Sequence, residues 1–311
     1  MTSTAAAPNG EPATLHRLVA QGFSTRVIRE LARPRGPWPL DRIQAVIDCA
    51  DRSSSLADAF DAAYTLLERQ YRCEYVIKNA LIQQRTDVAE SRSVNAFVGL
   101  PVRMSIADVV VVDEHATAYE IKTDLDSFTR LDLQLFDYSM CFEHVYVVTS
   151  ETKGLRALDA APSHVGVLLT TDTGAISVAR AAQTNHDRLD QSSLFRILRK
   201  NERLAIAQRH YGYVVDVPPA RLYQRLAGLF AQLPLEIAYR EFVTELRTRD
   251  SRCRQAAREA NLPQSLRAAA YAVALSPLAW RRLGIALQRP AADFIIPAPD
   301  ADRQPCTPIG L

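Results

Sequence analysis

The chain has 311 residues, of which 48% are hydrophobic and 23% are charged, and this is the composition of a globular protein of about two domains. No run approaches the ~20 apolar residues that cross a bilayer, and the N-terminal segment lacks the basic and apolar regions of a secretory signal. The five cysteines are widely spaced without a C-x-x-C pair, which argues against a zinc ribbon or a disulfide scaffold. We therefore expect a cytoplasmic protein with no membrane partner.

The net charge of +2 conceals an asymmetry between the two halves of the chain. Residues 1–150 contain 15 Lys and Arg against 20 Asp and Glu, a net charge of −5, whereas residues 151–311 contain 22 against 15, a net charge of +7. Only four of the 37 cationic residues are lysines: Lys78, Lys122, Lys153 and Lys200. An acidic half joined to a basic half fits a metal site beside a surface that binds a polyanion.

The N-terminal part of the chain has the patterns of a short tail followed by helices. Residues 1–12 are rich in Ala, Pro and Thr and are expected to be disordered. Residues 13–70 are expected to form a helical segment, interrupted by the proline-rich stretch 33–39. The apolar spacing predicts helices over Thr14–Ala32, Asp41–Cys49, Ser55–Gln70 and, beyond that segment, Arg72–Arg85.

The period of the apolar residues then changes from helical to strand-like over residues 71–180. Short β-branched runs predict strands over Val94–Val98, Ile106–Val112, Thr117–Lys122 and His144–Thr149, with a helix over Phe128–Cys141. Val165–Leu169 and Ala175–Val178 flank Asp172-Thr-Gly174 and predict a closing hairpin. We expect a mixed α/β core, in which a central sheet is flanked by helices.

The remaining chain is predicted to be a basic helical region over 181–289 and a proline-rich tail over 290–311. A predicted helix over Ser193–Arg209 would place four cations on one stripe: Arg196, Arg199, Lys200 and Arg203. The ordinary interpretation is a solvated helix face, and the functional one is contact with nucleic-acid phosphates.

The segment from Ile106 to Lys122 carries the residues best suited to chemistry. Two strands joined by a turn would bring Asp108 near Glu120, and Glu120 and Lys122 are two apart and share a strand face. Paired carboxylates suit Mg²⁺, with Mn²⁺ able to substitute, and a lysine beside them suits phosphodiester hydrolysis. The ordinary interpretation is a solvated strand face. The same spacing recurs in Glu151-Thr-Lys153, which follows a strand end as a loop would.

Two i,i+4 pairs flank this segment: Glu74 with Lys78, and Gln134 with Tyr138. Each also has an ordinary interpretation, the first as a surface ion pair and the second as the side of a helix with a half-buried tyrosine.

Taken together, Asp108, Glu120-x-Lys122 and Gln134-x-x-x-Tyr138 resemble the PD-(D/E)XK nuclease superfamily, and the last element is similar to its RecB-like branch. The stretch from residue 119 to residue 149 is similar to a bacterial family of predicted nucleases. The resemblance covers roughly residues 70–180 and leaves 1–70 and 181–311 uncovered. The motif of the superfamily has a proline before its first acid, where this chain has Ala107; the proline is often missing in members of the superfamily.

The resemblance implies a restriction-endonuclease-like core and a role for each matching residue. Asp108, Glu120 and the Ile121 carbonyl would be metal ligands, with Glu74 as a further candidate, and Lys122 would be the catalytic lysine. Gln134 and Tyr138 would position the substrate or Lys122. Arg103, just before the second strand, is a further candidate for contact with nucleic acid.

We therefore expect a Mg²⁺-dependent deoxyribonuclease. The alternatives are a non-catalytic nucleic-acid-binding or regulatory protein on the same fold, and a helical interaction protein that forms a homodimer or binds a protein partner. Endonuclease and exonuclease action, on DNA or on RNA, are equally compatible with these residues. A phosphate-binding G-x-x-x-x-G-K-[ST] loop, a G-x-S-x-G elbow and an H-x-x-x-H pair are absent from the sequence.

Overall fold

A computed structural model describes residues 11–34, 40–51, 53–87, 94–171 and 174–295 of the chain. Residues 1–10 of the predicted N-terminal tail and residues 296–311 of the predicted proline-rich tail lie outside the described residues. The same holds for residues 35–39 of the proline-rich stretch and for residues 172–173 of the predicted hairpin turn.

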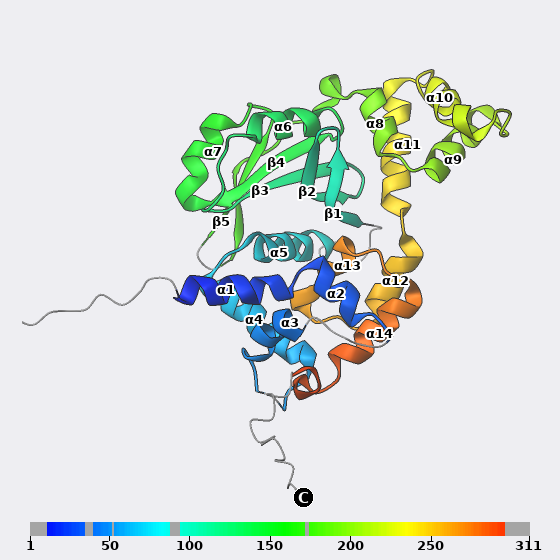
Figure 1. Ribbon diagram of the computed structural model, residues 1–311. Coiled ribbons are helices and arrows are strands. Elements are labelled where there is room, and N and C mark those ends of the chain that lie inside the picture. The colour runs from blue at the N-terminus through cyan, green and yellow to red at the C-terminus, as the bar shows by residue number, and fades with distance from the viewer. Residues whose placement is uncertain (1–10, 35–39, 52, 88–93, 172–173, 296–311) are drawn as a thin grey trace, which may run out of the picture.

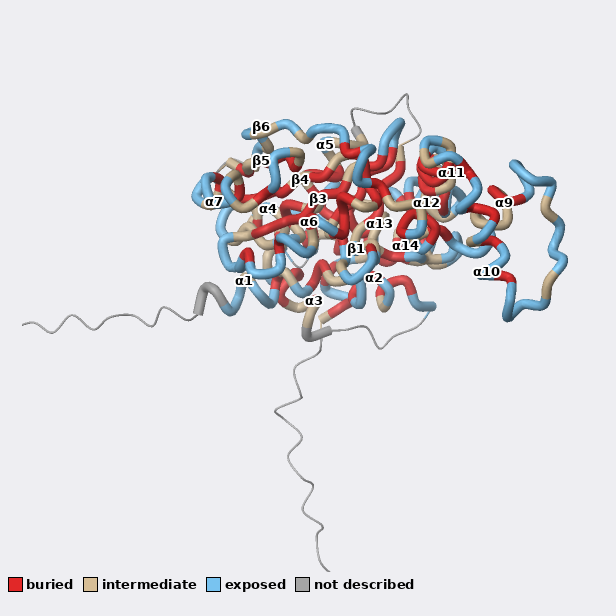
Figure 2. The backbone as a smooth tube through the Cα atoms, turned by 90° about the horizontal axis from the view of Figure 1, so that it is seen from above, coloured by how far each residue is buried: buried red, intermediate tan, exposed pale blue. Residues whose placement is uncertain are grey.

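A six-stranded mixed sheet forms the centre of the fold, as the sequence predicted. Its strands are β1 (Asn95–Val102), β2 (Ser105–Val112), β3 (Ala116–Lys122), β4 (His144–Ser150), β5 (Gly166–Thr170) and β6 (Ile176–Arg180), and they lie side by side in this order. The first three strands are antiparallel, β3, β4 and β5 are parallel, and β6 is antiparallel to β5. Strand β3 is almost entirely buried, whereas most of β6 is exposed (Figure 2).

Helices cover both faces of the sheet (Figure 1). Helix α5 (Glu74–Asp87) packs on one face, and helices α6 (Leu131–Ser139) and α7 (Gly154–Ala160) pack on the other. The α/β class with helical extensions is therefore confirmed. Helix α7 was not among the predicted elements, although parallel neighbours such as β4 and β5 require a crossover connection of this kind. The first strand was predicted to end at Val98, whereas β1 continues through Gly99 and Pro101.

The first and the last helices of the described residues meet in a helical domain on the far side of α5 (Figure 1). One hydrophobic cluster, which includes the fully buried Trp280, joins the following helices. They are α1 (Glu11–Gly22), α2 (Thr25–Leu31), α3 (Leu40–Ile47), α4 (Leu56–Gln70), α12 (Ser251–Glu259), α13 (Ala269–Ala272) and α14 (Pro277–Leu287). Short 3-10 turns, η3 (Gln264–Leu266) and η4 (Ala291–Phe294), belong to the same region.

The predicted single helix over Thr14–Ala32 is wrong, because the chain turns between α1 and α2. Gly22 ends α1 against α3, where a side chain would lie only 2.3 Å from Val46, and Ser24 is extended, with φ −68° and ψ 149°. Tertiary packing therefore sets the break, and no proline marks it in the sequence.

The basic region divides between the two hydrophobic clusters. Four of its helices belong to the hydrophobic cluster that also contains residues of α6: α8 (Gln191–Ile197), α9 (Lys200–Tyr211), α10 (Pro219–Phe230) and α11 (Leu235–Thr248). Helices α12 to α14 belong to the helical domain. Two further short turns are η1 (Glu151–Lys153) and η2 (His186–Arg188). None of the helices in the described ranges is long and apolar enough to cross a membrane.

Candidate active site

The ladder between β2 and β3 opens at the position where the first acid lies. Val109 opposite Tyr119 is the last pair of this ladder, and beyond it the Oδ2 atom of Asp108 accepts a hydrogen bond of 2.8 Å from the Ile121 amide. Asp108 is thereby bound to Ile121, the residue that follows Glu120. The two acids therefore lie on neighbouring strands, as the sequence predicted.

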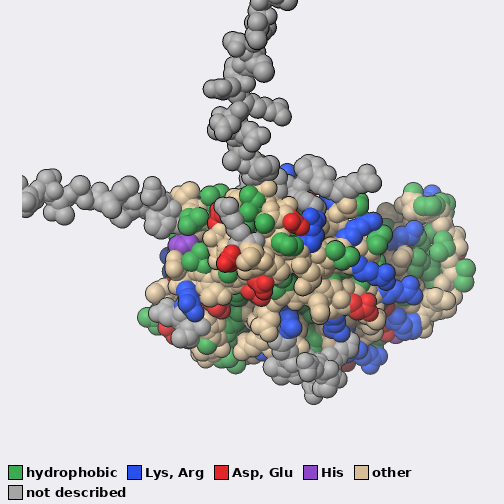
Figure 3. Space-filling model, turned by 90° about the horizontal axis from the view of Figure 1, so that it is seen from below, with side chains coloured by type: hydrophobic (Ala, Val, Ile, Leu, Met, Phe, Trp, Pro, Cys, Tyr) green, Lys and Arg blue, Asp and Glu red, His purple; other side chains and the backbone are tan. Residues whose placement is uncertain are grey.

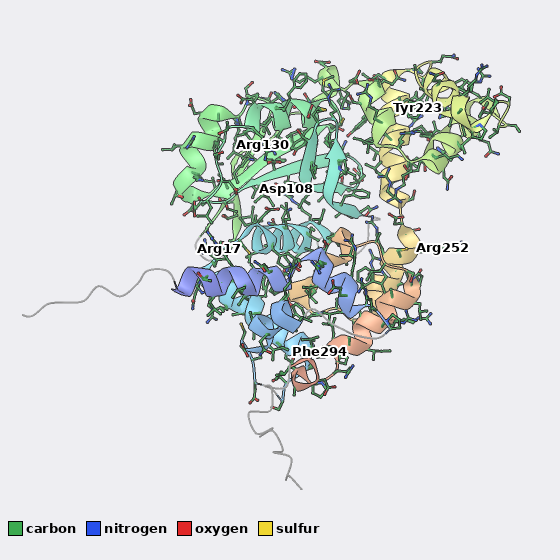
Figure 4. All side chains as sticks on the ribbon, viewed as in Figure 1. Arg17, Asp108, Arg130, Tyr223, Arg252 and Phe294 are labelled. Atoms are coloured by element: carbon green, nitrogen blue, oxygen red, sulfur yellow. The ribbon has the colours of Figure 1, made fainter. Side chains whose placement is uncertain are left out.

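Gly99 explains why Asp108 can leave the regular sheet face. The pairs Val98–Val109 and Leu100–Ala107 place Gly99 opposite Asp108, and its φ of +69° is a conformation that favours glycine. Val110 and Ala107 lie three residues apart, yet both belong to the cluster on the α6 side. The alternation of side chains is thus interrupted between them. This turn of the strand pair brings Asp108 toward α5, as Figure 4 shows.

Helix α5 contributes a lysine to the first acid. The Nζ atom of Lys78 lies 3.2 Å from Asp108 Oδ1 and also forms an ion pair with Glu74. Burial disfavours the Lys78 ammonium, but the carboxylates of Asp108 and Glu74 outweigh burial and raise its pKa. The contact between Lys78 and Asp108 was not predicted from the sequence, where the ordinary interpretation of Glu74 and Lys78 was a surface ion pair.

The Asp108 carboxyl holds its proton unusually well. Its burial is the main cause, Lys78 opposes the shift, and the neighbouring Glu120 and Glu74 add to it, so that its pKa rises to about 6. A carboxylate such as Asp108, whose charge is disfavoured by burial and by neighbouring carboxylates, is characteristic of a site that gains from a bound cation.

Glu120 and Lys122 are buried together beside helix α6. Lys122 Nζ donates to Glu120 Oε1 at 2.8 Å and to Gln134 Oε1 at 2.9 Å, and the side chains of Lys122 and Glu120 are 10% and 3% exposed. An ammonium group has three donors, so Lys122 retains one N–H for a water molecule or a phosphate oxygen. These contacts argue against the solvated strand face that was the ordinary interpretation.

The tyrosine of the Gln-x-x-x-Tyr element joins the two strands that carry the acids. Tyr138 Oη lies 2.7 Å from Glu120 Oε2 on β3 and 2.8 Å from the carbonyl oxygen of Ile106 on β2. The ring is fully buried, and burial together with Glu120 raises the pKa of the phenol. Tyr138 therefore remains a neutral donor that orients Glu120.

The donor set suits a hard cation that retains water. Within the described part of the chain, no group of three or more His, Cys, Asp or Glu side chains is arranged to hold a metal ion. Mg²⁺, however, is commonly bound through one or two carboxylates, with water and substrate phosphate as further ligands. Each Asp108 and Glu120 oxygen accepts one protein hydrogen bond and has a second lone pair available. Asp108 and Glu120 therefore fit such an ion.

The other predicted site residues differ in whether they contact Asp108 and Glu120. The Glu74 side chain is 53% exposed and reaches Asp108 only through Lys78. The Ile121 amide is bound by Asp108, and a role for its carbonyl as a ligand stays a prediction. The second Glu-x-Lys match forms η1 instead of a strand, and Lys153 donates to the Thr123 and Asp126 carbonyls.

Arg103 has an internal role in the structure. Its guanidinium donates to Asp137 Oδ1 at 3.0 Å and to Ser193 Oγ at 2.6 Å. It thereby fastens the β1–β2 turn to α6 and α8, and it adopts a positive φ of 54° in doing so. These contacts account for Arg103 without nucleic acid.

The predicted cationic stripe over Ser193–Arg209 is wrong as a single helix face. Leu198 is extended and buried, and Glu202 restarts the helix by accepting the Arg199 amide at 2.6 Å. The stripe residues then separate by environment: Arg199 pairs with Asp250 at 2.7 Å, Arg203 stacks between two aromatic rings, and Arg196 and Lys200 are exposed.

Comparison with known proteins gives one family. The family model described as Bacteriophage P4 protein cII matches residues 68–268, which is 201 of the 311 residues. The matched range contains the whole sheet and every residue of the candidate active site. No curated protein and no solved structure matches the chain significantly.

Proposed function

For this chain, which belongs to the bacteriophage P4 protein cII family, we propose that it is a metal-dependent nuclease acting on DNA. The proposal is drawn from the two acids and the lysine that the chain places on the neighbouring strands β2 and β3. The observation that carries this proposal is the buried, hydrogen-bonded group of Glu120, Lys122 and Tyr138, with Asp108 held beside it by the Ile121 amide. A purely structural sheet has little reason to bury an acid and a lysine next to a second, partly buried acid.

Each residue has a chemical role in this proposal. Asp108 and Glu120 would hold the cation, and Tyr138 and the Ile121 amide keep their carboxylates oriented. A bound Mg²⁺ lowers the pKa of water and neutralises charge on a phosphodiester. Lys122, fixed by Glu120 and Gln134, presents its remaining N–H to the attacking water or to a phosphate oxygen. Burial of this group limits competing bulk water.

Exposed arginines support a polyanionic substrate. Arg252 and Arg258 on α12 and Arg281 on α14 are exposed, and Arg282 on α14 is half-buried. None of the four has an acidic partner among the residues that the structure describes. Gly284 lets α14 approach α12 closely, because a side chain there would lie 2.6 Å from the Ala260 carbonyl oxygen. In the view from below, Lys and Arg side chains gather over this side of the molecule (Figure 3), where Figure 4 labels Arg252.

The decisive experiment is cleavage of DNA by the purified full chain. Plasmid, linear duplex and single-stranded DNA are incubated with Mg²⁺, Mn²⁺ or EDTA, beside the Asp108→Asn and Glu120→Gln variants. We expect cleavage with either cation, none in EDTA, and none by the two variants. DNA binding without cleavage under every condition would favour the alternative, a non-catalytic nucleic-acid-binding or regulatory protein.

A further inference from the structure

A cavity of about 310 Å³ lies between the helical domain and the sheet core. Its walls come from the α1–α2 junction, the start of α5, β1 and α13, and they include Phe23, Ser24, Ile28, Lys78, Val98 and Val273. We call it the interdomain pocket. Its volume lies at the lower end of the range for small-molecule sites, about 300–1,000 Å³.

The interdomain pocket adjoins the candidate active site. Lys78 lines the pocket, and its Nζ atom lies 3.2 Å from Asp108 Oδ1. Glu74, the other partner of Lys78, also lines the pocket. A group bound in the pocket would therefore be one side chain away from a phosphodiester held at Asp108.

The walls suit a flat, largely apolar group. The rings of Phe23 and Tyr75 have centroids 4.7 Å apart, and both residues line the pocket together with aliphatic side chains such as Ile28 and Val273. Among the residues that line the pocket, only Lys78, next to the candidate active site, is cationic. The pocket therefore lacks the cations that would bind a phosphate group. Nucleobases stack on such side chains whatever their sequence.

Ser24 provides a polar group that the fold leaves unused. It occupies the N-cap position of α2, where a serine side chain ordinarily accepts a backbone hydrogen bond, yet it makes no such bond. Its hydroxyl oxygen is buried and has no hydrogen-bond partner within the described ranges. Because the oxygen itself has no exposed surface, it reaches the pocket only after the side chain rotates about χ1. The hydroxyl can then donate to a base carbonyl and accept from a base amino group.

We propose that the interdomain pocket receives one unpaired base of the strand whose phosphodiester is bound at Asp108 and Glu120. This inference rests on the proposed nuclease function and specifies its substrate. A paired base must be extruded before it can enter such a pocket, and extrusion is costly in duplex DNA and nearly free in a single strand. The protein therefore binds single-stranded DNA or frayed ends in preference to intact duplex.

The test measures binding in EDTA, so that it depends on neither metal nor cleavage. The probes are a ten-residue oligothymidylate and a fully abasic strand of the same length. One stacked base corresponds to about a 5- to 150-fold difference in affinity, and the wild-type protein should prefer the oligothymidylate by a factor in this range. Equal affinity for the two probes would overturn the inference.

Two variants locate the preference. Ala272 is half-buried in the pocket wall, and Ala272→Phe fills the cavity. The ratio of the affinity for the oligothymidylate to the affinity for the abasic strand should then fall close to one. The affinity for the abasic strand itself should not change. Ala205→Phe, at a half-buried position on α9, is the matched control and should keep the preference. Ser24→Ala leaves the fold intact and should lower affinity for the oligothymidylate about fivefold, as expected for one hydrogen bond.

The outcomes separate the pocket from the proposed function. If Ala272→Phe and Ser24→Ala both keep the full preference, the pocket is not the base site, even if the protein cuts DNA. If the preference is lost in these variants but the wild-type protein never cuts DNA, the pocket stands and the nuclease proposal fails.

Discussion

The hydroxyl of Tyr138 lies 2.7 Å from Glu120 Oε2, and it also lies 2.8 Å from the Ile106 carbonyl oxygen. One side chain of α6 therefore connects the strand of the second acid to the strand of the first. Because burial raises the pKa of the phenol, its hydroxyl stays a neutral donor at neutral pH.

Removal of this hydroxyl should disturb both stability and chemistry. In Tyr138→Phe, Glu120 Oε2 and the Ile106 carbonyl lose their shared donor, so we expect the free energy of unfolding to fall by about 1–3 kcal/mol. Cleavage should fall at least tenfold because Glu120 is no longer oriented. The matched control is Tyr239→Phe, whose hydroxyl accepts from the Ala116 and Glu143 amides away from the site. It should lose comparable stability and retain cleavage, as measured by chemical denaturation and a cleavage assay.

Lys122→Ala should separate binding from turnover. The variant should bind DNA as the wild-type protein does and cleave it roughly 10²–10⁴-fold more slowly, the range for a positioned proton-handling group. Lys153→Ala is the matched control, because Lys153 belongs to the other Glu-x-Lys sequence and binds loop carbonyls. If both variants cleave at the wild-type rate, the observed activity does not belong to this site.

The buried Asp108 carboxylate should destabilise the metal-free protein in a pH-dependent way. Its folded pKa of about 6 lies above the ordinary value of 3.8, so the cost is absent below pH 3.8, grows between pH 3.8 and 6, and is complete above pH 6. In EDTA at pH 8, Asp108→Asn should therefore be more stable than the wild-type protein by up to about 3 kcal/mol. The difference should vanish near pH 4, and an equal difference at both pH values would refute this assignment.

The exposed cations of the interrupted stripe should contribute to affinity without contributing to turnover. If Arg196 and Lys200 contact duplex phosphates, their joint replacement by alanine should flatten the slope of log affinity against log salt by up to ~2 units. All sequences should be weakened alike, because phosphate contacts carry no base information. Arg199→Ala is the control, since Arg199 is engaged by Asp250. An unchanged slope in the double variant would show that Arg196 and Lys200 are solvated side chains that do not contact phosphates.

Strand positions in the core could be predicted because local sequence determines them. The β-branched run Ile106–Val112 and the spacing of Glu120 and Lys122 identify neighbouring strands directly, and the structure pairs them. The interruptions at Ser24 and Leu198 could not be predicted, since both depend on packing between segments that are distant in the sequence.

The contacts that complete the candidate site were equally hidden from the sequence. Lys78 contacts Asp108 across the packing of α5 on β2, beside the irregularity of the strand pair at Gly99, and the spacing of Lys78 and Asp108 in the sequence does not indicate this contact. The interdomain pocket joins residues as distant as Phe23 and Val273. The scarcity of lysine was the one available signal, because two of the four lysines lie at this site.

The central claim is that Asp108 and Glu120 together hold one divalent cation. Titration of the purified protein with Mn²⁺, followed by electron paramagnetic resonance of the free ion, tests it most directly. We expect one tight site in the wild-type protein and in Glu151→Gln, and its loss in Asp108→Asn and in Glu120→Gln. Unchanged Mn²⁺ binding in the last two variants, or the absence of a tight site in the wild-type protein, would contradict the claim.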